Sequence, residues 1–454
     1  MSFRGNLVAS VLALMVSALA VGGAQAQSIA QALTTAYDHA PDLQAALLNA
    51  KASAENIALA EAGKRPTIGA SLTGSYDWTV ANQTFTDSNS LNAGLRYNQT
   101  IFDNGKTDAQ IESARALTQV AEYQIRSTEQ TVLLAVVQAY MNVLSGRQLV
   151  ALRQENRSFY SAQLQSSRDR LDVGEGTRIE VAQAEARLAS GDAAYRAAVS
   201  SLEIAQATFQ RYVGQAPQNL TADHNFARLI PASLPAAIAA AEVDHPAILA
   251  SKAAIRAAQA ASDGAAAAFG PSATINGSVG RTLVNTAKGS NDSLSGTLGF
   301  QITVPIYAGG AIGAGVRKAN IQEIKSEVDA MSAYDQVREA VISAWAGIQS
   351  ADAQIAAANS AVSAGKVVVD GVIQERDLGT STTLDVLNAQ AELTSASESR
   401  ITASTNKVIA TFSLLAAIGH LTAADLGLNV QIKSAARYTQ AVDDVWAELR
   451  TVTE

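Results

Sequence analysis

The spacing of hydrophobic residues changes along the chain, and each change marks a different kind of element. Over 105–172, apolar side chains recur every three or four positions without a proline, which is the period of a helix face. Alanine, glutamine, glutamate, arginine and leucine dominate this stretch, and all are good helix formers. The pattern predicts one helix roughly 100 Å long at a rise of about 1.5 Å per residue. Two glycines in Val173–Thr177 end it, and a second helix is predicted over 178–214.

Before the long helix the period of the pattern falls to two residues. Apolar and small polar residues alternate over 66–80 and again over 91–103, which predicts the two strands of a hairpin. The polar residues 82–90 between them are predicted to form its loop. A helix broken near Pro41 is predicted to precede the strands.

The same order of elements then returns 205 residues later. The first repeat is predicted over 27–217, a linker over 218–234 and the second repeat over 235–420. The second repeat has predicted strands at 271–284 and 293–307, a long helix at 310–377 and a shorter helix at 384–419. Six residue pairs share this offset: Pro41 and Pro246, Pro66 and Pro271, Gly105 and Gly310, Tyr140 and Trp345, Gly174 and Gly379, Gly214 and Gly419.

The first 26 residues have the features of a secretory signal peptide. Arg4 supplies the positive charge, 7–21 form a short apolar run, and Ala24–Ala26 is a small-residue cleavage site. The alternative, an uncleaved membrane anchor, is disfavoured because a membrane-spanning helix needs about 20 apolar residues.

Composition and charge exclude several classes of function. The net charge is −8 without a basic patch, which argues against nucleic acid as a partner. There is no cysteine, and the four histidines are scattered, so no catalytic residue, metal site or cofactor is predicted. The glycine-rich segment 309–315 lacks the lysine of a phosphate-binding loop. An enzyme is therefore the least favoured class.

If the strands lie in a membrane, several copies of the chain are needed to close a barrel. Alternation of apolar and small polar residues is typical of a membrane β-barrel with a wet lumen, although an ordinary soluble sheet shows it too. Four strands do not close a barrel, and open strand edges are not tolerated in lipid. Two copies would give eight strands around a filled interior, and three would give twelve around an open lumen.

At this point the chain resembles the TolC family of outer-membrane channel proteins, over essentially the whole mature sequence. The resemblance rests on the duplicated order of elements and on two similar turns, 173–184 and 378–389, each with a threonine and an acidic residue at the start of an alanine-rich helix. It implies a mainly helical fold with membrane β structure, in which a homotrimer forms a 12-stranded β-barrel continued by a long α-helical periplasmic barrel. The tail, 421–454, is then expected at the equatorial region of the helices.

The resemblance also implies partners and a site. A periplasmic adaptor and an inner-membrane transporter, of the ABC or RND type, are expected to act with the channel in the outer membrane of a Gram-negative bacterium. Adaptor docking is expected at the two turns. Their residues are Gly174, Glu175, Gly176 and Thr177 in the first, and Gly379, Thr380, Ser381 and Thr382 in the second.

A gate is expected at the periplasmic tip. Asp385 matches one acidic ring position of the family, whereas the second ring position is Asn388, and Glu180 takes the place of a tip aspartate. The usual tyrosine and arginine partners fall on Arg376 and Ser381, so the closing bonds differ. We expect Arg178, Arg376 and Asp377 to supply another set. The alternative for Asp385 and Glu180 is that they only stabilise the first turns of their helices.

The sequence therefore predicts a passive exit duct for drug efflux, type I protein secretion or both. The alternative is a non-conducting trimeric spacer of structural or adhesive role, which conductance measurements distinguish from a pore.

Overall fold

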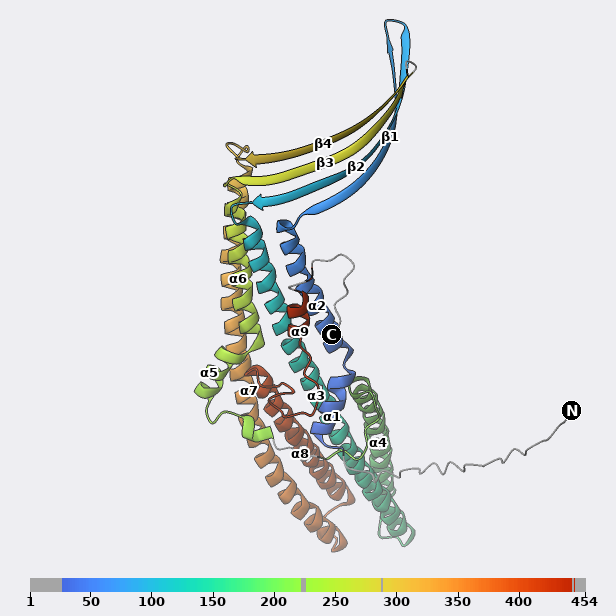
Figure 1. Ribbon diagram of the computed structural model, residues 1–454. Helices are drawn as coiled ribbons and strands as arrows, with labels where there is room; N and C mark the ends of the chain where they lie inside the picture. The colour runs from blue at the N-terminus through green and yellow to red at the C-terminus, as the bar shows by residue number, and fades with distance from the viewer. Residues whose placement is uncertain (1–26, 222–225, 287–288, 443–444, 446–454) are drawn as a thin grey trace, which may run out of the picture.

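The computed structural model describes residues 27–221, 226–286, 289–442 and 445, and the predicted signal peptide, 1–26, lies outside them. A curved antiparallel sheet lies at one end of a long layer of helices (Figure 1). The sheet order is β1 (Thr67–Ala81), β2 (Thr84–Phe102), β3 (Ser272–Thr286) and β4 (Gly289–Thr303). The central pair, β2 with β3, therefore joins the two repeats.

The predicted polar loop at 82–90 is wrong. Only Asn82 and Gln83 form the turn of the first hairpin, and both have positive φ, 51° and 62°, as a tight two-residue hairpin turn requires. Strand β2 already begins at Thr84. Backbone pairing does not need apolar side chains, so the hairpin continues beyond the apolar part of the sequence. At the other end, β4 stops at Thr303 instead of the predicted 307, since Pro305 has no N–H to donate.

Each strand is continued by a helix, so the helical layer repeats the order of the sheet. The helices beside the sheet are α2 (Pro41–Glu61), α3 (Lys106–Asp172), α6 (Pro246–Ala267) and α7 (Ala311–Asp377). They pack in the order α2, α3, α6, α7, which matches β1 to β4. Strand β1 and helix α2 therefore form one side edge of the chain, and β4 and α7 form the other (Figure 1).

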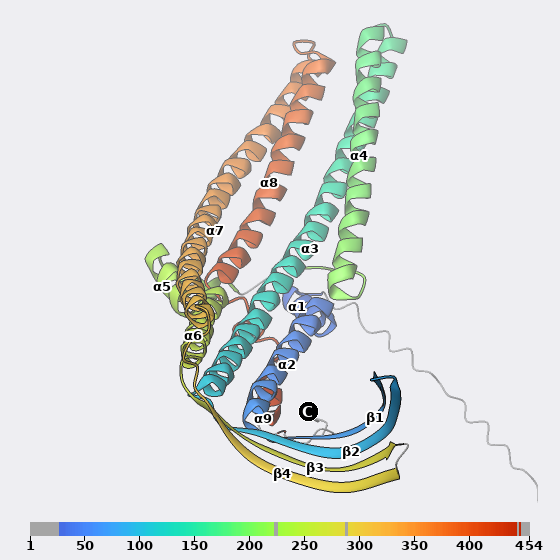
Figure 2. The ribbon, with the colours of Figure 1, turned by 90° about the horizontal axis from the view of Figure 1, so that it is seen from above.

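The second half of each long helix packs with a shorter helix that returns from the tip. Helix α4 (Arg178–Val213) returns along α3, and α8 (Thr383–Ala417) returns along α7 and also contacts α3. The two hairpin tips lie at the same end of the molecule, far from the sheet (Figure 2). Helices α3 and α7 both have 67 residues and begin 205 residues apart, at Lys106 and Ala311.

The main hydrophobic core lies between the sheet and the tips. Helix α1 (Ile29–His39) packs there against α3 and α4, and the short helix α5 (Leu234–Asp244) packs against α7 and α6. Buried residues at the start of the tail belong to the same core. Tyr140 of α3 is fully buried, and its hydroxyl donates to the carbonyl oxygens of Gln27 and Thr221, at 2.6 and 2.7 Å. This residue ties the beginning of the first repeat to the linker that follows it.

The described part of the C-terminal tail lies along the middle of the helical layer and ends in α9 (Ala436–Val442) beside α2 (Figure 1). The buried carboxylate of Glu129 on α3 accepts a hydrogen bond from the Ala423 N–H, at 2.6 Å. Burial raises the pKa of Glu129. Further along, the Ala435 N–H donates to Glu122, and the Lys433 ammonium donates to the Tyr37 carbonyl. The tail thus connects α1 to α3 through hydrogen bonds.

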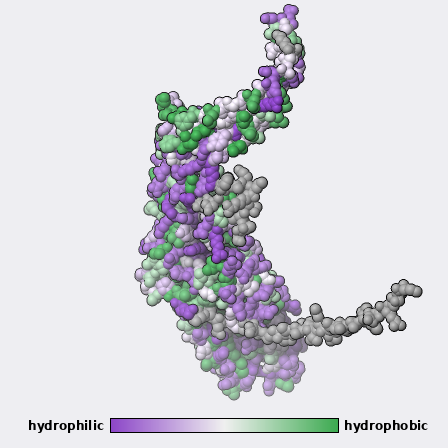
Figure 3. Space-filling view, in the orientation of Figure 1, coloured by the Kyte–Doolittle hydropathy of each residue, from purple (hydrophilic) through white to green (hydrophobic). Residues whose placement is uncertain are grey.

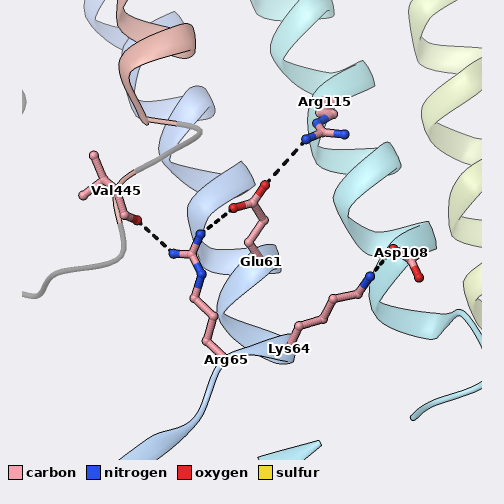
Figure 4. A network of polar contacts seen from close by, with 6 residues as sticks. All are labelled: Glu61, Lys64, Arg65, Asp108, Arg115 and Val445. Carbon is pink, nitrogen blue, oxygen red and sulfur yellow. Dashed lines mark hydrogen bonds and ion pairs between the residues drawn. The ribbon is translucent and has the colours of Figure 1, made fainter. Parts of the chain in front are cut away.

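A polar network fixes the helices where they meet the sheet (Figure 4). Glu61 at the end of α2 accepts from Arg65 at 2.8 Å and pairs with Arg115 of α3 at 3.5 Å. Lys64 pairs with Asp108 of α3, and Arg65 also donates to the Val445 carbonyl. These contacts set the angle at which β1 and β2 leave the helical layer.

Candidate functional site

The register of the sheet keeps apolar and polar side chains on opposite faces across all four strands. One row across the sheet contains Ile68, Tyr97, Gly277 and Leu298, and the next row on the same face contains Ala70, Leu95, Val279 and Gly296. The rows on the other face consist of small or polar residues, with Val284 as the apolar exception in the row of Ser75 and Ser90. An example is the row Ser71, Gly94, Gly280 and Ser295.

The apolar face has no cover in the described chain. Ile68, Leu72 and Leu298 are 73, 72 and 84 % exposed. Apolar residues gather over the part of the sheet nearest the helices (Figure 3). A face of this kind fits the outward, lipid-contacting side of a membrane sheet, since large apolar patches seldom stay exposed to water. No helix among the described residues combines the length and hydrophobicity needed to cross a bilayer.

Both helical tips close with the same turn. Gly174, at φ 78°, donates from its N–H to the Leu171 carbonyl, and Glu175 donates to the Arg170 carbonyl, at 3.0 and 2.8 Å. In the second tip, Gly379, at φ 81°, donates to Arg376 and Thr380 donates to Glu375. Glycine is favoured at both positions because a Cβ is strained at positive φ. The chain therefore reverses tightly at both tips.

The returning helices begin at capping threonines. The Thr177 hydroxyl accepts from the Glu180 N–H, and the Thr382 hydroxyl accepts from the Asp385 N–H. The residues just before the glycines, Val173 and Leu378, are apolar and 71 and 81 % exposed. The tips thus present a rigid turn with an exposed apolar side chain, a combination suited to a protein partner.

Asp385 is an exposed carboxylate that also completes a capping box. Its Oδ2 accepts from the N–H and the hydroxyl of Thr382, at 2.9 and 2.6 Å. These hydrogen bonds lower the pKa of Asp385 below its ordinary value. The carboxylate therefore remains charged at neutral pH, and its contribution to the cap is lost only as the pH falls through this lowered pKa. The structure thus shows the capping role, and the ring remains a prediction.

Replacing Asp385 with asparagine separates the two roles. An asparagine oxygen still accepts from Thr382, so the helix start is retained while the charge is lost. If three copies form an acidic ring, Asp385→Asn lowers the preference of the channel for cations, as measured by the reversal potential in a KCl gradient. Thr382→Ala is the matched control. It weakens the cap by about 1 kcal/mol but keeps the charge. Equal reversal potentials in wild type and Asp385→Asn would leave capping as the only role.

Arg376 is the buried charge of the tip. Its Nε and one terminal nitrogen donate to Asp377 at 3.1 and 2.7 Å, and its other terminal nitrogen donates to Gln163 of α3. Arg376 is 8 % exposed and Gln163 is 9 % exposed. The contact joins α7 to α3, and therefore one helical hairpin to the other. Arg178, expected in the same set, is exposed and makes no hydrogen bond or ion pair with another described residue.

Two further tip residues differ in their surroundings. Asn388 of α8 accepts a hydrogen bond from Arg187 of α4 at 2.6 Å, so it also joins the two hairpins. Glu180 is half-buried, and its Oε2 is shielded from solvent without a hydrogen-bond partner among the described residues. Just beyond these residues, Leu387 of α8 packs with Tyr160, Leu164 and Ala184 in a small hydrophobic cluster.

The tip therefore contains contacts that the sequence analysis did not anticipate. Gln163 and Arg187 are the partners that bring Arg376 and Asn388 across to the other repeat. Gln163 stands between Ala162 and Leu164, and nothing in this local sequence marks it as a partner of Arg376. In the part of the chain that the structure describes, no three histidine or acidic side chains cluster as a metal site would require.

Comparison with known proteins agrees with this architecture. The family model for outer membrane efflux proteins matches residues 32–215 and 237–420, two segments displaced by the same 205 residues as the repeats. The chain belongs to the outer membrane efflux protein family. The members of this family are channel proteins of the outer membrane rather than enzymes.

Two relatives and one solved structure show how far sequence identity to this chain varies among similar proteins. The chain is 35 % identical to the outer membrane efflux protein BepC of Brucella suis over 449 residues, 98 % of this chain and 97 % of BepC. It is 26 % identical to outer membrane protein TolC of Escherichia coli K12, over 90 and 86 % of the two chains. The CmeC outer membrane channel of Campylobacter jejuni has the same fold, with a TM-score of 0.75 at 16 % identity over 92 and 89 % of the chains.

Proposed function

We propose that three copies of this chain form one continuous duct through the outer membrane and into the periplasm, as the exit of an export system. The two-faced register of the sheet is the observation that carries the proposal. An apolar face without cover and a polar face of small residues suit a barrel wall between lipid and water. Twelve strands enclose an open lumen, whereas eight enclose a filled one.

The side edges of the chain support closure into a ring. Strand β1 and strand β4 are both unpaired on one side, and such edges need partners in lipid. On the same side as β4, helix α7 presents an exposed apolar stripe, each residue 58–69 % exposed: Ile321, Ile324, Val328 and Met331. On the side of β1, α2 exposes Leu48 and Leu59. Contact between β4 and α7 of one copy and β1 and α2 of the next covers both edges.

Channels of this family work with periplasmic adaptors and inner-membrane transporters in tripartite systems. For this chain, the tip turns are the proposed docking points, and the contacts of Arg376 and Asn388 hold the tip closed until an adaptor docks. The proposed cargo is small molecules, because the family and the Brucella relative are both named for efflux. Energy comes from the transporter, since the duct itself is passive.

Conductance in planar bilayers tests the proposal. The mature protein forms pores of uniform unit conductance if it is a duct, whereas a spacer leaves the bilayer non-conducting.

Deleting the gene identifies the cargo. Increased drug sensitivity with unchanged secreted proteins supports efflux, and loss of a secreted protein with unchanged drug sensitivity assigns type I secretion instead.

The absence of cysteine makes docking directly testable. A single cysteine at Thr380, labelled with a photo-crosslinker, is expected to crosslink to the purified periplasmic adaptor because the side chain lies in the tip turn. Lys252→Cys, exposed on α6, which packs beside the part of α7 nearest the sheet and away from both tips, is the matched control and should give no adduct. Adducts of equal yield at both positions would contradict docking at the tip.

A further inference from the structure

The polar face of the sheet carries two charged residues among the described residues of its strands, Arg96 of β2 and Asp77 of β1. Asp77 lies toward the hairpin end of β1, where its carboxylate accepts from the Ser75 hydroxyl at 3.0 Å. Arg96 lies toward the helical end of β2, opposite Gly69 of β1. The two charges therefore sit near opposite ends of the strands.

The surroundings of Arg96 leave its guanidinium free to extend. Its neighbours across the sheet are Gly69 and Ser278, and Gly94 precedes it by two positions on the same face. Even a Cβ built on Gly69 would meet no atom within 4 Å. Arg96 is exposed and forms no hydrogen bond or ion pair with another described residue.

On the apolar face, in contrast, the arginine is paired with a carboxylate. Arg281 of β3 lies on the apolar face, and its Nε donates to Asp292 Oδ1 at 2.9 Å, with a second bond to Oδ2. A charge that faces lipid is costly unless it is paired. Arg96 lies at the depth of the apolar rows of Tyr97 and Leu95, yet it has no counter-charge. An unpaired arginine at this depth is tolerated where it faces water.

In a closed barrel of three copies, the three Arg96 side chains would lie close to one another. Twelve strands spaced about 4.8 Å apart and tilted about 40° enclose a radius of roughly 12 Å. An extended arginine side chain reaches about 6–7 Å inward, so three guanidiniums approach within roughly 9 Å of one another. This separation is close to the Debye length of about 8–10 Å at physiological ionic strength. A solute crossing this level thus passes through the field of all three charges.

We infer that the three copies of Arg96 form a ring of positive charge, a cationic collar, inside the barrel at its end nearest the helices. This inference rests on the proposed trimeric duct. The collar attracts anions and favours anionic cargo. Glycine and small polar neighbours leave the three charges exposed to the lumen, and no acidic residue of the described strands lies near them on the polar face to offset their field. The collar is separate from the acidic residues of the tip, and a solute that enters from the barrel side meets the collar first.

Tripolyphosphate added to the barrel side of reconstituted wild-type channels tests the collar, because it meets Arg96 before it reaches the tip. We expect it to block conductance, and Arg96→Gln to weaken the block at least about threefold and to shift the reversal potential toward cation preference. Arg96→Lys, which keeps the charge, should keep both properties.

The double variant Arg281→Gln with Asp292→Asn removes the outward pair and is expected to behave as wild type. Conducting Arg96→Gln channels with unchanged block and reversal potential would overturn the collar alone. Wild-type protein without any pore activity would overturn the duct and the collar together.

Discussion

Val328→Asp is expected to abolish assembly of the proposed trimer. Val328 lies in the middle of the exposed apolar stripe of α7, the helix that continues from the edge strand β4. In the proposed ring this stripe packs on the next copy, so the new carboxylate would be buried without a partner. Such a charge costs on the order of 3–5 kcal/mol at each of the three interfaces. The measurement is the mass of the detergent-solubilised protein by light scattering.

The matched control is Gln322→Asp. Gln322 is an exposed polar residue one position from Ile321, and it lies outside the stripe. The same charge is added to α7 less than about two turns away, so the control should remain trimeric. Val328→Asp protein that is still trimeric, with unchanged thermal stability, would show that α7 does not form the interface. A monomeric Gln322→Asp variant would show that the effect is not specific to the stripe.

Sequence patterns predicted the elements well because their causes are local. Helix α3 was predicted over 105–172 and is observed over Lys106–Asp172, since helix-forming residues continue without a break until the glycines of the turn. The duplicated prolines and glycines fixed the second repeat equally well, with α7 observed over Ala311–Asp377. Periodicity also assigned the two faces of each strand, because a strand alternates whatever its partners are.

The errors and omissions come from long-range geometry. The predicted loop at 82–90 became strand because its backbone pairs across a tight turn at Asn82 and Gln83, which side-chain polarity does not reveal. The partner of Arg376 on the other hairpin was not predicted, since Gln163 lies 213 residues away and meets it through the packing of α3 against α8. Likewise, the isolation of Arg96 depends on the register that places Gly69 beside it.

Arg376→Leu is expected to increase the resting conductance of the channel, which is the second large effect. Leucine fills part of the space but leaves the buried Gln163 side chain without its donor, at a cost of about 1–3 kcal/mol. Because this contact joins α7 to α3, its loss loosens the second hairpin against the first, and the two are then joined at the tip by the Arg187–Asn388 hydrogen bond. Single-channel recordings without adaptor should therefore show a larger unit conductance than wild type.

Arg178→Leu provides the comparison, since it removes an exposed arginine at the same tip that has no partner among the described residues. Its conductance should equal that of wild type. A Gln163→Leu variant and the Gln163→Leu, Arg376→Leu double variant complete a double-mutant cycle. If the two side chains act through one contact, the double variant opens the channel no further than either single variant, because the contact is lost only once. Additive increases would assign separate roles to the two residues, and conductance unchanged in Arg376→Leu would show that the resting state is held by other contacts.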